Sequence, residues 1–139
     1  MLKEKQVALA MILREGKLLI MERKDENPMW DHKWEFPGGK VDPGETHDQT
    51  VKREILEETG LVIDQTQFLG VHSHDWNLQN GDVLRVHLHC HLANVDQEMI
   101  TFEEDHAYQY KWIDPKTIGD WDLLEANFEL AKNLLWPIL

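Results

Sequence analysis

The sequence predicts an α/β or α+β layered fold in which strands are interleaved with two helices. Short apolar or alternating runs, which are typical of strands, recur along the 139 residues. Two longer stretches with apolar residues at helical spacing interrupt these runs, and strands interleaved with helices give layered domains. We expect residues 1–139 to form a single domain, because the length suits one and neither a repeat nor a long linker divides them.

The first elements are two strands, predicted at 7–13 and 17–23 around a turn at residues 15–16. A polar loop at 24–33 separates them from a short extended piece at 34–36. A Pro-Gly-Gly sequence follows this piece, and we expect it to end the extended conformation there.

The first helix is predicted at about 46–59. Gly60 follows it and is suited to the left-handed conformation that commonly ends helices. Val51 and Ile55, with Leu56 beside them, are expected to form the buried stripe of this helix.

The remaining chain predicts further strands and one more helix. The strands are expected at 61–63, 68–74, 83–93 and 108–113. The final helix, at about 123–136, is apolar nearly all round, and this distribution predicts that it packs on the sheet.

The charge balance bears on the partners of the protein. Asp and Glu number 26 against 14 Lys and Arg, which gives a formal net charge of −12. Such a field repels nucleic-acid polymers, whose binding rests on Lys and Arg contacts to phosphate. It suits divalent cations, and an acidic protein can handle phosphates when metal ions lie between the two sets of negative charge.

The cysteine count and the hydropathy indicate the compartment. Cys90 is the one cysteine, so no intrachain disulfide can form, and this fits a reducing environment. No stretch approaches the roughly 20 apolar residues of a membrane span. We therefore expect a cytoplasmic protein without a membrane partner. A homodimer is compatible with the sequence but is not indicated by it.

The first helix carries an unusual concentration of carboxylates. Glu54, Glu57 and Glu58 are three and four residues apart and therefore share one face. Glu45 stands just before the first turn, while Arg53 precedes Glu57 by one turn and can pair with it. Carboxylates that converge in this way repel one another unless a cation lies among them. Mg²⁺ or Mn²⁺ prefers such oxygen ligands.

The full spacing of residues 39–61, GKVDPGETHDQTVKREILEETGL, reproduces the pattern GX5EX7REUXEEXGU, where U is an apolar residue. This pattern is the Nudix box, and every fixed position in it is intact. The chain thus resembles the Nudix hydrolases. The resemblance implies a three-layer α/β/α sandwich with a mixed sheet, in which the box forms a loop–helix–loop unit.

The resemblance also implies roles for individual residues. The implied ligands of Mg²⁺ or Mn²⁺ are Glu54, Glu57, Glu58 and the carbonyl group of Gly38. Arg53 and Glu45 are implied to support the catalytic centre by holding loop and helix in register. The implied reaction is attack of water on phosphorus while metal ions neutralise the developing charge.

Two regions of the sequence could supply the general base, because members of the family differ in the position of this residue. Glu54 in the box is one candidate. A downstream acidic loop offers Glu103, Glu104 and Asp105, of which we single out Glu104 as a ligand or base. A merely solvated acidic loop is the competing interpretation.

Residues 34–46, WEFPGGKVDPGET, resemble the MutT branch, whose members hydrolyse nucleoside triphosphates, including oxidised guanine nucleotides, to monophosphate and pyrophosphate. We therefore predict a metal-dependent pyrophosphohydrolase acting on a nucleoside triphosphate, with an oxidised or non-standard purine as one option. One alternative is hydrolysis of ADP-ribose, another nucleoside diphosphate derivative or a capped RNA end. An alternative of another class is a Nudix module that senses a nucleotide without cutting it.

Three types of side chain are candidates for substrate contact. Asn127 lies on a leucine stripe, where it either caps the final helix or reads a purine edge. Arg23 ends the second strand, where MutT-like proteins contact phosphate, although a simple surface role fits equally. Trp34, Trp30 or Trp76 could stack on a base, or serve only in packing.

The strand at 83–93 alternates apolar residues with a polar set consisting of Arg85, His87, His89 and His91. Side chains two apart lie on one face, so three histidines could bind a transition metal. Their spacing of roughly 6.5–7 Å is wide for one ion, however. A polar sheet face, or one that lines the substrate cleft, is the preferred interpretation. His72 and His74 also share a face and are treated alike.

Overall fold

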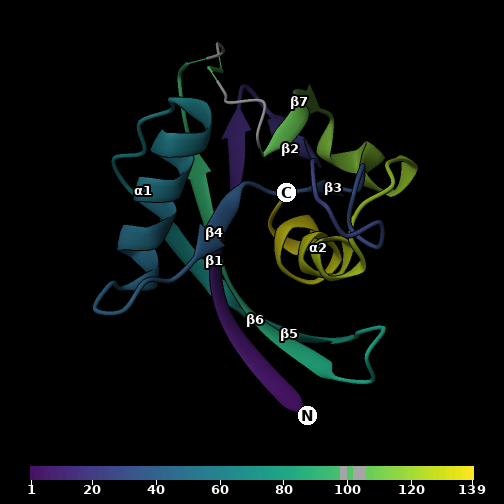
Figure 1. Cartoon of the computed structure of the whole chain (residues 1–139). Helices are drawn as coiled ribbons and strands as arrows, with labels where there is room; N and C mark the ends of the chain where they lie inside the picture. The colour runs from purple at the N-terminus through teal and green to yellow at the C-terminus, as the bar shows by residue number, and fades with distance from the viewer. Residues whose placement is uncertain (98–99, 102–105) are drawn as a thin grey trace.

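Seven strands form one mixed sheet in the computed structural model, which describes residues 1–97, 100–101 and 106–139 (Figure 1). The strands are β1 (Leu2–Arg14), β2 (Lys17–Arg23), β3 (Trp34–Glu35), β4 (Gly38–Lys40), β5 (Gln67–Asn77), β6 (Val83–Asn94) and β7 (Ala107–Ile113). The order is β3-β2-β1-β6-β5, with β4 paired to β1 and β7 paired to β2. Strand β1 runs parallel to β6, while the other pairings are antiparallel.

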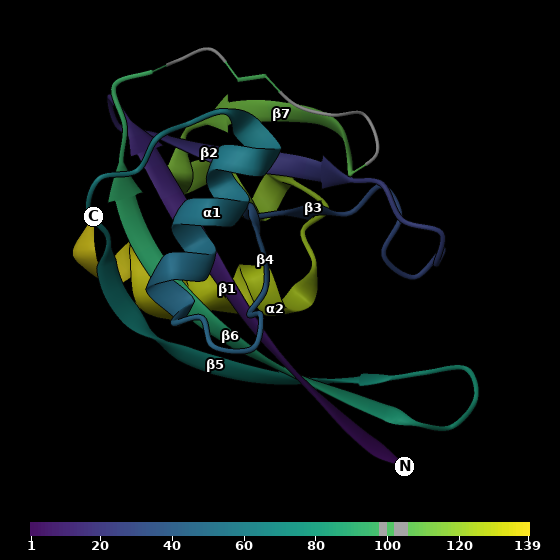
Figure 2. The same cartoon turned by 60° about the vertical axis from the view of Figure 1, so that its left-hand side comes forward.

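Helices cover both faces of this sheet (Figures 1 and 2). The helical segments are α1 (His47–Thr59), η1 (Pro115–Asp120), α2 (Glu125–Leu130), η2 (Ala131–Leu135) and η3 (Trp136–Ile138). Side chains of β1 alternate between two cores, because successive residues of a strand point to opposite faces. Ala10 packs towards α1, whereas Leu9 and Met11 pack towards α2. The predicted α/β/α sandwich is confirmed.

Helix α1 begins and ends at residues whose side chains favour its termini. Thr46 is the N-cap, and its hydroxyl accepts a hydrogen bond from the Gln49 amide while the Gln49 side chain accepts one from the Thr46 amide. Gly60 adopts the left-handed conformation, with φ at 74°, and its N–H donates to the carbonyl of Leu56. The helix limits predicted from the sequence are confirmed to within one residue.

The buried stripe of α1 differs in one position from the prediction. Val51 and Ile55 are fully buried, as expected. Leu56 is 52% exposed, so its predicted place in the stripe is wrong. Thr50 and Thr59 complete the buried face instead. Threonine is tolerated there because its hydroxyl donates to a carbonyl one turn earlier, as Thr59 does to Ile55.

Two segments depart from the predicted strands. Residues 61–63 form no strand, although Leu61 and Ile63 are buried. Their alternation reflects a loop that inserts every second side chain beneath α1, and such a loop mimics the period of a strand. Strand β4 was not expected, because glycines usually interrupt sheets. Here Gly38 permits close approach, since a Cβ atom at this position would lie 2.6 Å from Leu9 Cα.

The final helix is not one regular element. Residues 125–130 are α-helical, but the chain then widens into a π-helical segment and closes with a 3-10 turn. Its packing against the sheet is confirmed, because Leu130 and Leu135 belong to the core on that side. Within the described part of the chain, no helix has the length and apolar character needed to cross a bilayer.

The histidine side of β6 faces α1 and not a substrate cleft. His91 is 1% exposed, and its Nε2 lies 2.8 Å from Nδ1 of His47, the first residue of α1. Its Nδ1 lies 3.0 Å from the Thr66 hydroxyl. His89 stacks on the His47 ring. The opposite side of β6, with Leu88 and Cys90, belongs to the other core. The expected separation of faces is confirmed, and the polar face is part of the packing of α1.

The environment of His91 predicts a pH-dependent stability. Burial, together with the charge of His47, lowers the pKa of His91 from 6.5 to about 4. The unfolded chain therefore binds this proton more readily, so the contribution to stability is complete above pH 6.5 and declines as the pH falls towards 4. The free energy of unfolding should lose up to about 3 kcal/mol from this group.

Urea unfolding of the wild type and His91→Gln at pH 7 and pH 4.5 measures this effect. Glutamine keeps hydrogen-bonding capacity without titrating, so the stability advantage of the wild type over the variant should shrink at the lower pH. A parallel decline of both proteins would show that His91 is not the group responsible.

Candidate active site

The carboxylates of the predicted site converge where β4 meets α1. Glu54, Glu57 and Glu58 of α1 line one pocket together with Gly38 and Gly39 of β4. The approach is close, since a Cβ atom on Gly39 would lie 2.6 Å from a carboxylate oxygen of Glu54. Glycine is therefore the residue that lets the backbone of β4 pass directly beside the acidic face of α1.

Arg53 joins the loop before α1 to the acidic face. Its Nε donates to Glu45 at 2.7 Å and its Nη2 donates to the same carboxylate at 2.9 Å. Nη1 reaches Glu54 at 3.0 Å and Glu57 at 3.3 Å. The Arg53 guanidinium, with help from the Thr50 hydroxyl, lowers the pKa of Glu45 to about 2. Charge-assisted bonds of this kind fix both loop and helix, which is the geometry expected for a supporting pair.

Glu58 is the most constrained of the carboxylates. Its Oε2 is buried without a hydrogen-bond partner in the described structure. Burial, followed by the nearby charges of Glu54 and Glu35, raises the pKa of Glu58 to about 9, although a hydrogen bond with the Gly38 backbone opposes this shift. A buried carboxylate oxygen with no partner, beside further carboxylates, is a donor set that fits a hard divalent cation.

Basic side chains line the same pocket as the carboxylates. Lys5, Arg23 and Lys40 are among them. Burial lowers the pKa of Lys5, and the charges of Arg23 and Lys40 contribute to the shift. Arg23 is held by ion pairs to Asp25 at 2.7 Å and to Glu35 at 3.1 Å. Three converging cations beside carboxylates can bind the phosphates of a substrate. Only Arg23 was expected here from the sequence.

A second, mainly apolar pocket of about 170 Å³ adjoins the first. The two share the wall formed by the three cations, Glu35, Gly38 and Gly39. Trp30 and Trp76 line the apolar pocket and meet edge to face at a centroid distance of 5.9 Å. Val86 and Leu88 of β6 supply part of its floor. An aromatic-lined pocket next to a phosphate-binding wall can receive a planar base.

Asn127 lies in this apolar pocket with 4% of its surface exposed. Its Oδ1 accepts a hydrogen bond of 2.9 Å from the Phe36 amide. Its Nδ2 has no hydrogen-bond partner among the described residues. The alternative in which Asn127 caps the final helix is wrong, because Leu124 is the N-cap and no side chain caps that helix. The amide of Asn127 instead connects α2 to the chain between β3 and β4.

The NUDIX domain model matches residues 3–135. The chain belongs to the Nudix family. A CTP pyrophosphohydrolase of Escherichia coli is 30% identical over 132 residues, which cover 90% of this chain and 92% of that protein. An 8-oxo-dGTP diphosphatase of the same organism is 38% identical over 61 residues, which cover 44% of this chain and about half, 47%, of that protein.

Structural comparison places the chain in the MutT-like branch of the Nudix family. The crystal structure of a MutT Nudix hydrolase from Burkholderia pseudomallei superimposes with a TM-score of 0.77 and 27% sequence identity. The match covers 94% of this chain and 97% of that one. The protein is thus a Nudix hydrolase, a class of enzymes that act on phosphoric anhydride bonds.

Trp34 and the downstream acidic loop were also expected to contribute to the Nudix site. Trp34 is 8% exposed, packs edge to face on Trp121 and does not line either of the two pockets. This placement argues against substrate contact by Trp34, and its contact with Trp121 explains why the chain buries it. Glu103, Glu104 and Asp105 lie outside the described residues.

Proposed function

We propose that this Nudix hydrolase converts a purine nucleoside triphosphate, with guanine or an oxidised guanine as its base, to the monophosphate and pyrophosphate. The continuity of the two pockets carries the proposal. An aromatic pocket for a base shares three cations with the pocket that the three carboxylates line. A nucleotide bound with its base against the Trp30–Trp76 pair would extend its phosphates towards Glu54, Glu57 and Glu58.

The metal-binding residues in this proposal are the three box glutamates with the backbone of Gly38. Nudix hydrolases generally use divalent ions, and the unpartnered Glu58 oxygen supports this donor set for Mg²⁺ or Mn²⁺. Such an ion, when bound, would neutralise the negative charge that develops on the phosphate oxygens during the reaction.

The chain's own residues then have distinct tasks. Lys5, Arg23 and Lys40 bind and orient the phosphate chain. Glu54, held by Arg53, accepts a proton from the attacking water as the general base. The new bond joins the water oxygen to a phosphorus of the α–β phosphoanhydride, the bridging P–O bond breaks, and the nucleoside monophosphate and pyrophosphate separate.

Asn127 supplies the preference for a keto purine. Its Oδ1 is engaged by the Phe36 amide, so the end that faces a ligand without a partner is the Nδ2 donor. Guanine presents the O6 acceptor where adenine presents an amino donor. A donor held in a mainly apolar pocket therefore favours guanine-type bases over adenine, since the amino group of adenine would leave it unpaired.

The test is a product assay with Mg²⁺ or Mn²⁺ across dGTP, 8-oxo-dGTP, dATP, CTP, ADP-ribose, NADH and diadenosine tetraphosphate. The expected result is preferential formation of monophosphate and pyrophosphate from a guanine-type triphosphate. Preferential cleavage of ADP-ribose or a dinucleotide would overturn the substrate assignment. Nucleotide binding without cleavage of any compound would support a sensing module instead.

Asn127→Asp tests the base preference without removing the contact to Phe36. Aspartate keeps an oxygen that can accept the Phe36 hydrogen bond, but it replaces the Nδ2 donor by a second acceptor. We expect kcat/KM for the guanine-type substrate to fall roughly 10- to 100-fold relative to dATP, as one lost base contact implies. Steady-state kinetics on both nucleotides measures this ratio.

Asn133→Asp is the matched control, because it makes the same change of charge at an exposed position of the same C-terminal segment. The control should retain the wild-type ratio. If Asn127→Asp also keeps the wild-type ratio while its melting temperature falls, Asn127 has a structural role only.

A further inference from the structure

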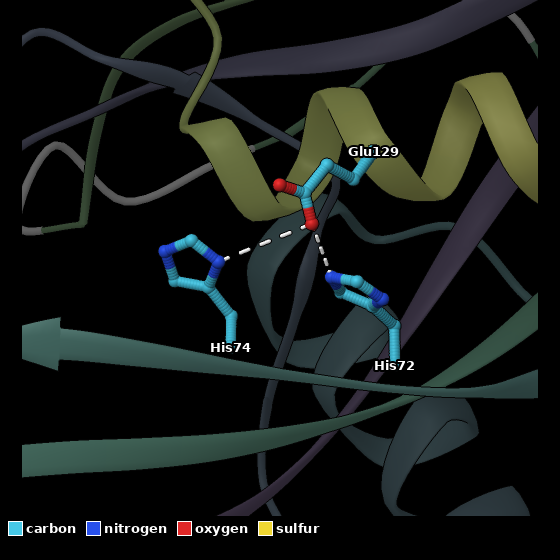
Figure 3. A group of neighbouring side chains, drawn as sticks. All are labelled: His72, His74 and Glu129. Atoms are coloured by element: carbon cyan, nitrogen blue, oxygen red, sulfur yellow. Dashed lines mark ion pairs between the residues drawn. The ribbon is translucent and has the colours of Figure 1, made fainter.

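A second group of potential metal ligands lies on the other side of the sheet from the Nudix box. His72 and His74 of β5 are two residues apart and point towards α2, where Glu129 faces them (Figure 3). One ligand atom from each of the three residues lies within 4.8 Å of the others. Helix α1 and its carboxylates cover the opposite face, so this group is separate from the hydrolytic site.

The contact between His72 and Glu129 is short, but it is not a hydrogen bond. His72 Nε2 lies 2.5 Å from Glu129 Oε2, yet this buried nitrogen has no hydrogen-bond partner. A hydrogen bond needs the N–H to point at the acceptor. Ligands of one ion instead direct their lone pairs at a common third point, so two of them lie close together without being aligned.

The third side chain brings a second nitrogen to the same point. His74 Nδ1 lies 4.0 Å from the same Glu129 oxygen. Ligands at the Zn²⁺ distances of about 2.0–2.1 Å in a tetrahedral site are roughly 3.3 Å apart. The two separations of 2.5 and 4.0 Å lie on either side of that value. Small side-chain rotations would therefore place all three atoms around one ion.

We propose that His72, His74 and Glu129 bind a transition-metal ion of the Zn²⁺ type. Two imidazoles and one carboxylate suit Zn²⁺ and related ions, whereas Mg²⁺ prefers oxygen ligands alone. Glu125 lies one helical turn before Glu129, with Oε2 4.0 Å from His74 Nε2, and can support the second histidine. The bound ion joins β5 to the helix that carries Asn127, so it fixes one wall of the base pocket.

Calorimetric titration with Zn²⁺ in the presence of excess Mg²⁺ tests the site, since Mg²⁺ occupies the Nudix carboxylates without competing for imidazole. Wild type should bind one equivalent. His72→Gln/His74→Gln should lower the affinity by more than about 100-fold, because it removes direct ligands. The matched control His87→Gln/His89→Gln changes two histidines of β6 that contact Ser73, Glu4, Gln6 and His47 and not Glu129, and it should bind as the wild type does.

Two further variants make the result decisive. Glu129→Gln should also lose binding, with circular dichroism confirming its fold. Glu57→Gln alters the Nudix box and should keep the equivalent of Zn²⁺. Loss of binding in Glu57→Gln, or its retention in His72→Gln/His74→Gln, would overturn the proposal.

Thermal unfolding gives a second readout that does not depend on activity. Zn²⁺ at one hundred times its Kd should raise the melting temperature of the wild type by roughly 8 °C, because it binds the folded state. The His72→Gln/His74→Gln variant should show no such rise. An equal rise in both proteins would place the ion elsewhere.

Discussion

Glu57→Gln is expected to retain the fold and to lose most of the turnover, with kcat at least about 100-fold below that of the wild type. The substitution removes one carboxylate charge from the acidic face of α1 without changing the size of the side chain. Glu57 is 60% exposed, and Arg53 at 3.3 Å is its only ion-pair partner in the described structure. Little stability depends on that pair, so the loss should be one of catalysis.

Steady-state kinetics and a melting curve separate these two effects. Glu15→Gln makes the same change in the exposed turn between β1 and β2, far from the carboxylates in the chain and outside the pocket. It should match the wild type in kcat and in melting temperature. Near-normal turnover of Glu57→Gln would exclude Glu57 as a metal ligand.

Gly39→Ala is expected to reduce kcat by about 100-fold or more, although it adds a single methyl group. That methyl group would lie 2.6 Å from a carboxylate oxygen of Glu54 and must displace it. The displaced group is the end of a flexible side chain, so the fold can adjust, whereas the catalytic geometry cannot. We therefore expect a small change in melting temperature and a large change in kcat.

The control for this prediction is Gly119→Ala in η1, where a Cβ atom would lie at an ordinary 3.7 Å from the Phe128 ring. This variant should keep wild-type kinetics. If Gly39→Ala keeps wild-type turnover, then the position of the Glu54 carboxylate does not limit catalysis, and the role of Glu54 as general base would be contradicted. If Gly39→Ala instead fails to fold, Glu54→Gln tests the same role without steric conflict.

Residues of the Nudix box were predictable because their interactions are local. Arg53 contacts Glu45, Glu54 and Glu57, which are all within eight residues of it. Glu45 and Glu54 were assigned through the resemblance to the Nudix box, whereas the helical period alone places Glu57 beside Arg53. The same applies to Thr46 and Gly60 at the two ends of α1, where the chemistry of the cap depends on the adjacent backbone.

The base pocket could not be predicted from the sequence, because contacts between distant parts of the chain form it. Asn127 and Phe36 are 91 residues apart, so no local pattern could reveal that the amide of one binds the backbone of the other. Trp30 and Trp76 line the pocket while Trp34 is buried against Trp121, although all of them are tryptophans in polar surroundings of the sequence. The way in which the loop before β3 and strand β5 pack around the cavity decides which rings line it.

The sequence by itself determined the family, with the carboxylates and arginine of the box, because these follow from spacing along a few turns of chain. The sandwich of helices on a sheet was implied by the resemblance to that family. Only the tertiary structure decided that Lys5 and Lys40 join Arg23 in the pocket of those carboxylates, and that His72 and His74 meet Glu129. These groups come from elements that the fold brings together. Their proximity is a property of strand order and helix packing, which single-residue propensities do not encode.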